Sequence, residues 1–250
     1  MTAQPPATRL ADMLRVHGRI LMFTGAGIST SSGIPDYRGP EGVWTTRQPV
    51  MYRDFMTSAA ARARYWQQKL EDRGAFGEAH PNEVHEAVVR LEEAGKLELV
   101  VTQNVDGLHR RAGTAPAMLV EIHGTNVEIE CQTCGTRTAP DPHFEAFAAS
   151  GVAPVCDCGG YLKPATISFG QQLRPADVVT AFRAADRCDM VLALGSTLSV
   201  APASEVPLAA VRRGVPYAIV NRGATDHDGL PFVTLRLEGD VGDIVPRAVE

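Results

Sequence analysis

The sequence predicts an α/β fold, namely a doubly wound parallel (Rossmann-like) sheet with a smaller lobe attached to it. Short apolar runs that suit buried parallel strands alternate along the chain with amphipathic stretches of helical length. The first apolar run, residues 20–23, leads into Gly25-Ala26-Gly27, which suits a turn that brings backbone N–H groups close to a phosphate. Together these observations favour one open sheet with helices on both faces.

The expected elements follow the chain in regular order. Strands are expected at 20–23, 97–102, 118–122, 190–194, 217–220 and 232–237, and helices at 7–16, 82–94, 175–185 and 203–213. The helix at 82–94 has the clearest boundaries, because Pro81 precedes it, Glu83 and Glu86 lie in its first turn, and Gly95 follows it.

Two insertions interrupt this alternation and set the domain organisation. Residues 36–80 are rich in aromatic side chains and are expected to form a helical module, whereas residues 124–164 contain four of the five cysteines. Neither insertion has an evident core of its own, so we expect the two to pack together as a small lobe. Residues 1–35, 81–123 and 165–250 would then form a discontinuous Rossmann-like domain.

Composition narrows the class of protein. The chain has 250 residues, 44% of them hydrophobic, which is enough for a full core in one or two domains. A net charge of −5 argues against a general nucleic-acid or membrane-surface binder. There is no N-terminal apolar segment typical of a secretory leader and no apolar run long enough to span a bilayer. We therefore expect a cytoplasmic protein without a direct nucleic-acid or membrane partner; the oligomeric state stays open, and a monomer is compatible with the sequence.

Four cysteines occur as two close pairs, Cys131 with Cys134 and Cys156 with Cys158. In a reducing compartment such a cluster is more often a metal site than two disulfides. Four thiolates complete the tetrahedral shell of zinc, so the predicted ion is structural and has no open position for catalysis. Reduced, unligated thiols are the alternative. The fifth cysteine, Cys188, precedes an apolar run and is interpreted as a core residue.

Small polar groups follow the predicted strands at several of their carboxyl ends, where ligands bind in open α/β sheets. These are Gln103, Asn104 and Asp106 after the second strand, His123 after the third, Ser196 and Thr197 after the fourth, and Asn221 after the fifth. Each alone could be a turn, but all of them together are hard to explain as turns. His123 is the candidate general base, whereas His85 and His109 lie in helical settings and are interpreted as structural.

The ordered set of motifs resembles the sirtuin family of NAD-dependent protein deacylases from about residue 20 to the C-terminus. The motifs are Gly25-Ala26-Gly27-Ile28-Ser29, Gly33-Ile34-Pro35-Asp36-Tyr37-Arg38, Gln103-Asn104-Val105-Asp106-Gly107-Leu108-His109, His123-Gly124, the cysteine quartet, Phe169-Gly170 and Gly195-Ser196-Thr197-Leu198. Within the family, the sequence around residues 38–42 and 64–66 looks closest to bacterial relatives of the lipoamidase-type members.

The resemblance implies a role for each matching position. It implies NAD contacts at Gly25, Ala26, Gly27, Thr30, Asp36, Tyr37, Arg38, Gln103, Asn104, Val105, Asp106, Gly195, Ser196, Thr197, Asn221 and Val241, with Gln103 and Asn104 on the nicotinamide ribose and Val105 and Asp106 on the carboxamide. His123 and Asn104 would be catalytic, and Phe169, Gly170 and Val200 would flank an acylated protein or peptide substrate.

The implied reaction consumes NAD and acyl-lysine and releases nicotinamide, free lysine and an O-acyl-ADP-ribose. Mono-ADP-ribosyl transfer in the same site and a non-catalytic NAD-binding module are the alternatives. Relatives that prefer acidic acyl groups carry Tyr-x-x-Arg in the helical module, but here Tyr65 is followed by Gln68 at that spacing. We therefore expect neutral acyl groups to be preferred over succinyl.

Overall fold

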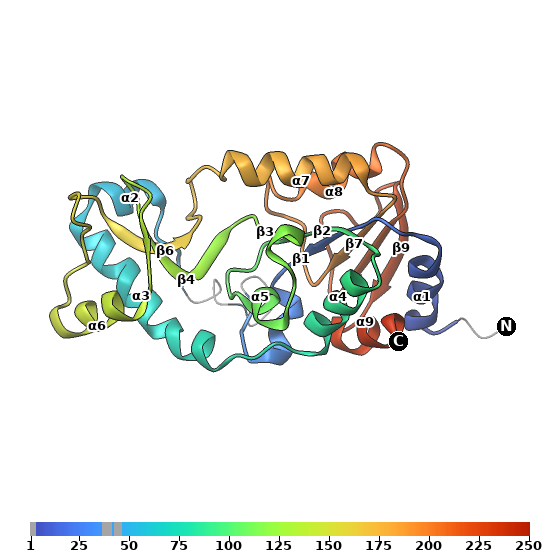
Figure 1. The fold of residues 1–250 in the computed structure, drawn as a ribbon, viewed down its shortest axis with the longest axis horizontal. Helices are drawn as coiled ribbons and strands as arrows, with labels where there is room; N and C mark the ends of the chain where they lie inside the picture. Colours follow the sequence, from blue (N-terminus) through green and yellow to red (C-terminus); the bar gives the residue numbers. More distant parts are fainter. Residues whose placement is uncertain (1–3, 37–41, 43–46) are drawn as a thin grey trace.

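The computed structural model describes residues 4–36, 42 and 47–250, which form two lobes side by side (Figure 1). The larger lobe contains one sheet with the strand order β3-β2-β1-β7-β8-β9, in which all neighbouring strands are parallel. Its strands are β1 (Ile20–Thr24), β2 (Leu97–Thr102), β3 (Leu119–Glu121), β7 (Met190–Leu194), β8 (Tyr217–Asn221) and β9 (Val233–Glu238). This is the doubly wound order of a Rossmann-like fold, so the predicted fold class is confirmed.

Helices cover both faces of this sheet (Figure 1). One face carries α1 (Pro6–Val16), α4 (Glu83–Glu93) and α9 (Val241–Val249), and the other carries α7 (Pro175–Arg187) and α8 (Glu205–Val211). The short helix α5 (Leu108–Ala112) and the 3-10 turns η1 (Ala26–Ile28), η2 (Thr30–Ser32) and η4 (Pro116–Met118) complete the lobe. The four predicted helices and six predicted strands are all present, with ends shifted by one or two residues.

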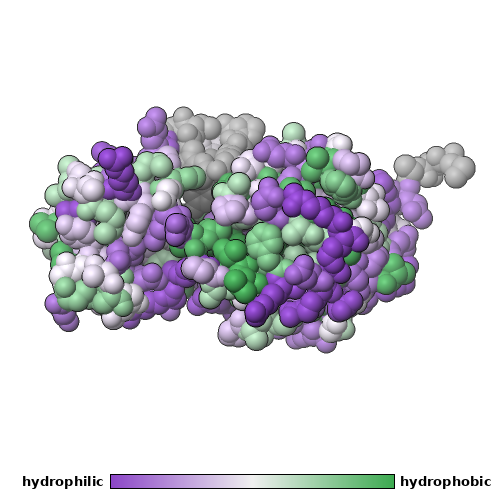
Figure 2. Space-filling model, turned by 90° about the horizontal axis from the view of Figure 1, so that it is seen from above, coloured by the Kyte–Doolittle hydropathy of each residue, from purple (hydrophilic) through white to green (hydrophobic). Residues whose placement is uncertain are grey.

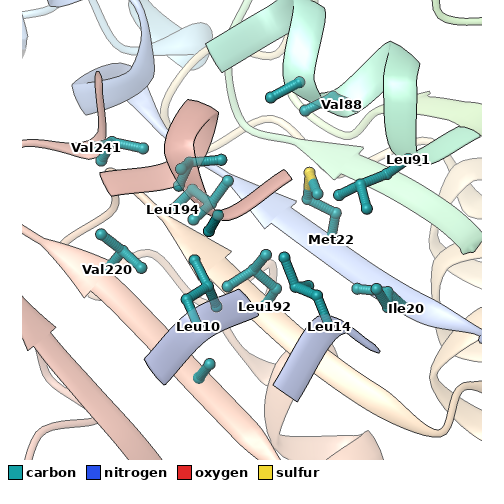
Figure 3. Close-up of a cluster of buried hydrophobic side chains, with 14 of the residues drawn as sticks. Leu10, Leu14, Ile20, Met22, Val88, Leu91, Leu192, Leu194, Val220 and Val241 are labelled. Atoms are coloured by element: carbon teal, nitrogen blue, oxygen red, sulfur yellow. The ribbon is translucent and has the colours of Figure 1, made fainter. Parts of the chain in front are cut away.

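The apolar sequence of strand β1 is explained by its burial on both faces of the sheet. Ile20 and Met22 pack into the cluster on the α1 face, whereas Leu21 and Phe23 pack into the cluster on the α7 face. Because successive side chains of a strand point to opposite faces, a strand covered on both sides needs an unbroken apolar run. Figure 3 shows the first cluster, in which Leu10 and Leu14 approach the sheet from α1.

The C-terminal helix α9 was missing from the sequence prediction. Its segment contains Gly242 and Pro246, which are poor helix formers. The helix is nevertheless stabilised at its start, where the Asp240 side chain accepts a hydrogen bond from the Gly242 N–H at 2.8 Å. Its apolar side then packs into the same cluster as α1 and α4 through Ile244 and Val245. Tertiary packing thus overrides the weak local propensity.

The smaller lobe combines residues from both insertions. It contains α2 (Tyr52–Thr57), α3 (Ala59–Glu78) and α6 (Asp141–Ser150), and an antiparallel sheet of order β5-β4-β6 made of Arg137–Thr138, Gly124–Cys131 and Leu162–Thr166. Trp66 of α3 is its central side chain, with ring centroids 5.1 Å from Phe144 and 5.9 Å from Phe147 of α6. The Trp66 indole also donates to the Leu162 carbonyl at 3.0 Å. The domain boundaries assigned from the sequence stay a prediction.

Among the described residues, no helix combines the length and the apolar composition that a bilayer crossing needs.

Candidate active site

The two central strands of the large sheet end in glycines that touch. β1 and β7 are neighbours at the point where the strand order reverses, the position at which open α/β sheets bind ligands. A Cβ on Gly27 would lie 2.7 Å from the Gly195 Cα, and a Cβ on Gly25 would lie 2.7 Å from the Gly195 carbonyl oxygen. No larger residue fits at either position. The glycine loop is therefore packed against the end of β7, where the N–H groups of Gly25 and Gly27 donate to the carbonyls of Leu194 and Gly195 at 3.0 and 2.8 Å.

A cavity of about 1160 Å³ extends from this loop into the junction with the small lobe. The predicted site residues that line it are Gly25, Ala26, Gly27, Thr30, Asp36, Gln103, Asn104, Val105, His123, Phe169, Gly170, Gly195, Ser196, Thr197, Val200, Asn221 and Val241. Tyr37 and Arg38 lie outside the described residues. In the view from above, apolar residues gather in the middle of the face (Figure 2).

Gln103 and Asn104 are held in place at the end of β2. The Gln103 amide donates to Ser196 Oγ at 2.7 Å, which joins the ends of β2 and β7. The Asn104 Nδ2 donates to the Gly25 carbonyl at 3.2 Å and to Ser29 Oγ at 3.1 Å. With Nδ2 engaged by the protein, Oδ1 is the atom of this amide that can accept a hydrogen bond from a ligand.

Asp106 differs from its neighbours because it does not line the cavity. Its carboxylate is buried and accepts hydrogen bonds from the Ser29 hydroxyl at 2.8 Å and from the Leu108 N–H at 2.9 Å. Burial raises the pKa of Asp106, although both of these hydrogen bonds favour the charged form. In this structure Asp106 thus supports Ser29, which in turn supports Asn104. Ser29 was not among the predicted site residues, although it belongs to the glycine-loop motif.

His123 follows β3 and lies in the wall of the cavity. Its Nδ1 lies 3.2 Å from the Gln103 carbonyl oxygen. Since a carbonyl can only accept, this contact favours the tautomer with the proton on Nδ1 and a lone pair on Nε2. An imidazole fixed in this way can take a proton at Nε2, which is what a general base requires.

The other end of the cavity is formed by the last strands of the sheet. Asn221 ends β8, and its Nδ2 donates to the carbonyls of Arg222 and Gly223 at 3.1 and 3.0 Å. Val241 begins α9, beside the capping residue Asp240, which also lines the cavity. The sequence identified Asn221 and Val241 but missed Asp240, whose position depends on the unpredicted helix.

The small lobe contributes the remaining wall. Tyr65, Gln68 and Lys69 of α3 line the cavity together with Phe169 and Gly170. Burial would raise the pKa of Tyr65, but the ammonium groups of Lys163 and Lys69 and the neighbouring hydroxyls of Thr166 and Ser168 together outweigh burial and lower it. Lys69 is engaged by the protein, since its Nζ donates to Asn126 Oδ1 at 3.3 Å. Gln68 likewise donates to the Gln48 carbonyl at 3.2 Å.

The four predicted metal ligands converge at the edge of the small lobe. The sulfurs of Cys131, Cys134, Cys156 and Cys158 all lie within 4.8 Å of one another, with Cys131–Cys158 at 3.5 Å and Cys134–Cys156 at 3.8 Å. Tetrahedral zinc, with Zn–S bonds of about 2.3 Å, requires sulfurs about 3.8 Å apart. A Cβ on Gly160 would lie 2.6 Å from Cys131 Sγ, so the loop closes around the sulfurs only with glycine there. This cluster fits a structural zinc ion, whereas Cys188 is buried elsewhere.

Comparison with known proteins agrees with this geometry. Residues 25–202 match the model of the Sir2 family. An "NAD-dependent protein deacetylase" of Rhodopseudomonas palustris is 38% identical over 94% of this chain and 92% of its own length, and one of Haloarcula marismortui is 38% identical over 96% and 92%.

Solved structures agree as well. A Sir2 structure with a p53 peptide and NAD⁺ has a TM-score of 0.85 at 33% identity and covers 96% of this chain and 95% of that one. A Sir2 structure bound to a propionylated peptide has a TM-score of 0.84 at 33% identity, with the same coverage. Because the match extends over nearly the whole chain and includes both lobes, the chain belongs to the Sir2 family.

Proposed function

We propose that this protein is an NAD-dependent protein-lysine deacylase that acts on acylated proteins or peptides. The observation that carries the proposal is one cavity that His123 and the amides of Gln103 and Asn104 line together. The glycine loop forms one side of this cavity, and the small lobe forms the other. A cavity of about 1160 Å³ has room for a dinucleotide and an acyl-lysine together. The activity of the relatives and the structures with NAD⁺ and peptide support the same conclusion.

The overall reaction balances as acyl-lysine, NAD⁺ and water giving lysine, nicotinamide and O-acyl-ADP-ribose. The residues of this chain would bind and orient the reactants. Asn104 Oδ1 would accept a hydrogen bond from a ribose hydroxyl, because its Nδ2 is already held by Gly25 and Ser29. His123 Nε2 would take a proton from a ribose hydroxyl, because the Gln103 carbonyl holds Nδ1.

The phosphates and adenosine are assigned to the large lobe. The N–H groups of Gly25 and Gly27 already donate to the carbonyls of Leu194 and Gly195. We therefore assign the phosphate oxygens to the Ala26 N–H in the turn after β1 and to the hydroxyls of Ser196 and Thr197, which follow β7. We assign Asn221 and Val241 to the adenosine half because they form the far end of the same cavity.

The substrate peptide is assigned to the edge between Phe169–Gly170 and Val200. Both segments line the cavity, so an extended peptide bound there would lie between them and pair with backbone groups of this edge. Recognition through main-chain hydrogen bonds would make the enzyme tolerant of sequence around the acylated lysine. The zinc site would hold the small-lobe wall of this groove, and its thiolates would need a reducing compartment such as the cytoplasm.

The test is incubation with NAD and a panel of acetyl, longer aliphatic, lipoyl and succinyl peptides, followed by nicotinamide release and peptide mass. Stoichiometric loss of the acyl group with nicotinamide release supports deacylation. Nicotinamide release with gain of an ADP-ribosyl mass supports transferase activity, and no release supports a binding module. The lipoyl peptide also tests the subgroup, which stays a prediction.

A further inference from the structure

Two histidines outside the cavity are buried side by side beneath residues 25–33, the segment after β1 that we call the cofactor loop. His85 of α4 and His109 of α5 are 0% and 2% exposed, and their ring centroids lie 5.0 Å apart at an interplanar angle of 65°. Within the described part of the chain, His85 Nε2 and His109 Nδ1 are buried without a hydrogen-bond partner. A buried polar atom left unpaired destabilises the folded state, so two such atoms on adjacent rings require an explanation.

The protons around His109 can be assigned from its neighbours. Its Nε2 lies 3.1 Å from Thr24 Oγ1, and the Thr24 hydroxyl donates its only proton to Thr102 Oγ1 at 2.8 Å. His109 Nε2 must therefore carry a hydrogen and donate it to Thr24, which leaves a lone pair on Nδ1. Burial, together with the neighbouring His85, lowers the pKa of His109 to about 3, so the ring is neutral.

This chain of hydrogen bonds ends at the backbone of Asn104, whose side-chain amide is proposed to bind the ribose. Thr102 Oγ1 also accepts the backbone N–H of Asn104 at 3.1 Å. The ring of His109 is thus separated from Asn104 by two hydroxyl groups, both of them buried. Any shift of Thr24 or Thr102 would change the direction of the Asn104 backbone and of its side chain.

His85 connects the same pair to the glycine loop. Its Nδ1 lies 3.0 Å from Asn82 Oδ1 and 3.3 Å from the Asn82 backbone N–H, at the start of α4. The Asn82 Nδ2 lies 2.8 Å from each of three acceptors in the cofactor loop, which are the Ile28 carbonyl and the hydroxyls of Ser31 and Ser32. The histidine pair is therefore attached to the loop on one side and to Asn104 on the other.

We propose that His85, His109 and one internal water bridging their two unpaired nitrogens form a positioning unit for the cofactor site. A water can donate to His109 Nδ1, and it can either donate to or accept from His85 Nε2, so it satisfies both atoms whichever tautomer His85 adopts. The unit does not touch the reactants; it fixes the loop and Asn104 relative to each other. This role rests on the proposed function, in which Asn104 binds the nicotinamide ribose.

The first test compares His109→Leu with His109→Gln in NAD binding by calorimetry and in steady-state kinetics. Leucine removes the donor to Thr24, whereas glutamine can supply an N–H in place of Nε2. We expect His109→Leu to weaken NAD binding and to lower kcat/KM for NAD about tenfold or more. His109→Gln should restore most of this loss. The KM for the peptide should stay unchanged in both variants. Wild-type kinetics of a folded His109→Leu protein would overturn the proposal.

His227→Leu is the matched control, because His227 is equally buried but bonds the Tyr217 hydroxyl at 2.9 Å outside the cavity. It should lower stability without changing NAD binding. If His109→Leu does not fold, Thr102→Val against Thr102→Ser tests the same chain, since only serine keeps the hydroxyl. Equal NAD affinity in these two variants would contradict the positioning unit.

A third measurement does not depend on NAD or on activity. The ¹⁵N shifts of the free protein should show His109 neutral with its proton on Nε2, and a crystal structure near 2 Å should show density for one water within hydrogen-bonding distance of His85 Nε2 and His109 Nδ1. A proton on Nδ1 of His109, or absence of the water, would overturn the proposal. Failure of the wild-type protein to turn over acyl peptides would instead count against the proposed function and leave this result standing.

Discussion

The two lobes are stabilised by different kinds of core. In the large sheet, β1, β7 and β8 are buried along their whole length, and apolar clusters on both faces hold the helices in place. In the small lobe, β4 contains both buried and more exposed residues, and half of the buried core residues are aromatic, from segments far apart in the chain. We expect the small lobe, which has the smaller apolar core, to depend on its four-cysteine cluster more than the large sheet does. The active-site cavity lies between these two lobes.

The largest expected effect is chemical and leaves both lobes folded. His123→Ala should lower kcat by about 10²–10⁴-fold, because it removes the general base, and Tm should stay close to that of the wild type. His143→Ala is the control, since His143 lies in the small lobe and bonds Thr138 Oγ1 outside the cavity. Steady-state kinetics at saturating NAD and peptide decide it: if the variant keeps more than about half of the wild-type kcat, His123 has no part in the mechanism.

The second prediction separates the lobes by stability. Cys156→Ser should lower the zinc content and cost about 2 kcal/mol or more, which in a chain of this size lowers Tm by about 4–8 °C. Hydrogen exchange should show the loss in β4, β6 and α3, while β1 and β7 keep their protection. Cys188→Ala should keep its zinc. Freshly purified wild-type protein without zinc, or unchanged melting after chelation, would refute the metal site.

The third prediction concerns the acyl end of the cavity. We expect the wild type to have a higher kcat/KM for acetyl or neutral longer acyl peptides than for succinyl, because Gln68 offers no charge and Lys69 is engaged by Asn126. Gln68→Arg should raise kcat/KM for succinyl about tenfold or more, since a charge-assisted hydrogen bond contributes about 1.5–3 kcal/mol.

The control for this prediction is Gln67→Arg, because Gln67 is exposed on the same helix and bonds Glu71 instead. It should leave the acyl preference unchanged. Side-by-side kinetics on one peptide sequence provide the comparison. A wild-type preference for succinyl would show that a cation of the cavity wall, such as Lys69 or Arg47, pairs with the acid.

The smallest effect probes the polar interior of the large lobe. Burial lowers the pKa of His85 to about 4 and that of His109 to about 3, so both are neutral in the folded state. Below the ordinary histidine pKa of about 6.5 the unfolded chain binds protons that the folded protein does not. The two histidines therefore do not lower the free energy of unfolding above about pH 6.5. As the pH falls from there toward their folded-state pKa values, the free energy of unfolding decreases, by about 1 kcal/mol per histidine at pH 5.5.

Urea unfolding of the wild type and of His85→Gln at pH 7.5 and 5.5 measures this dependence. Glutamine suits the third position of a helix with a capping asparagine, so the variant should fold and should lose less stability on acidification. An identical decrease in the free energy of unfolding of both proteins would show that His85 does not contribute to its pH dependence.

The sequence by itself determined most of the large lobe. Strands β1, β7 and β8 are buried on both faces, so each is an apolar run that can be seen without knowing its neighbours. The small polar groups that follow the strands, from Gln103 to Asn221, could be placed at one edge of the sheet because parallel strands end on the same side. The four cysteines could likewise be grouped, because tetrahedral zinc binding requires both the number and the type of ligand.

The tertiary structure decided what depends on contacts between distant residues. Helix α9 forms despite Gly242 and Pro246 because a cap and a shared core stabilise it. Asp106 follows the strand as predicted, but its carboxylate is turned toward Ser29 and Leu108, away from the cavity. The pairing of His85 with His109 joins α4 to α5. Local patterns record which face of an element is apolar, whereas the direction of a buried polar side chain is set by partners that only the folded chain brings within hydrogen-bonding distance.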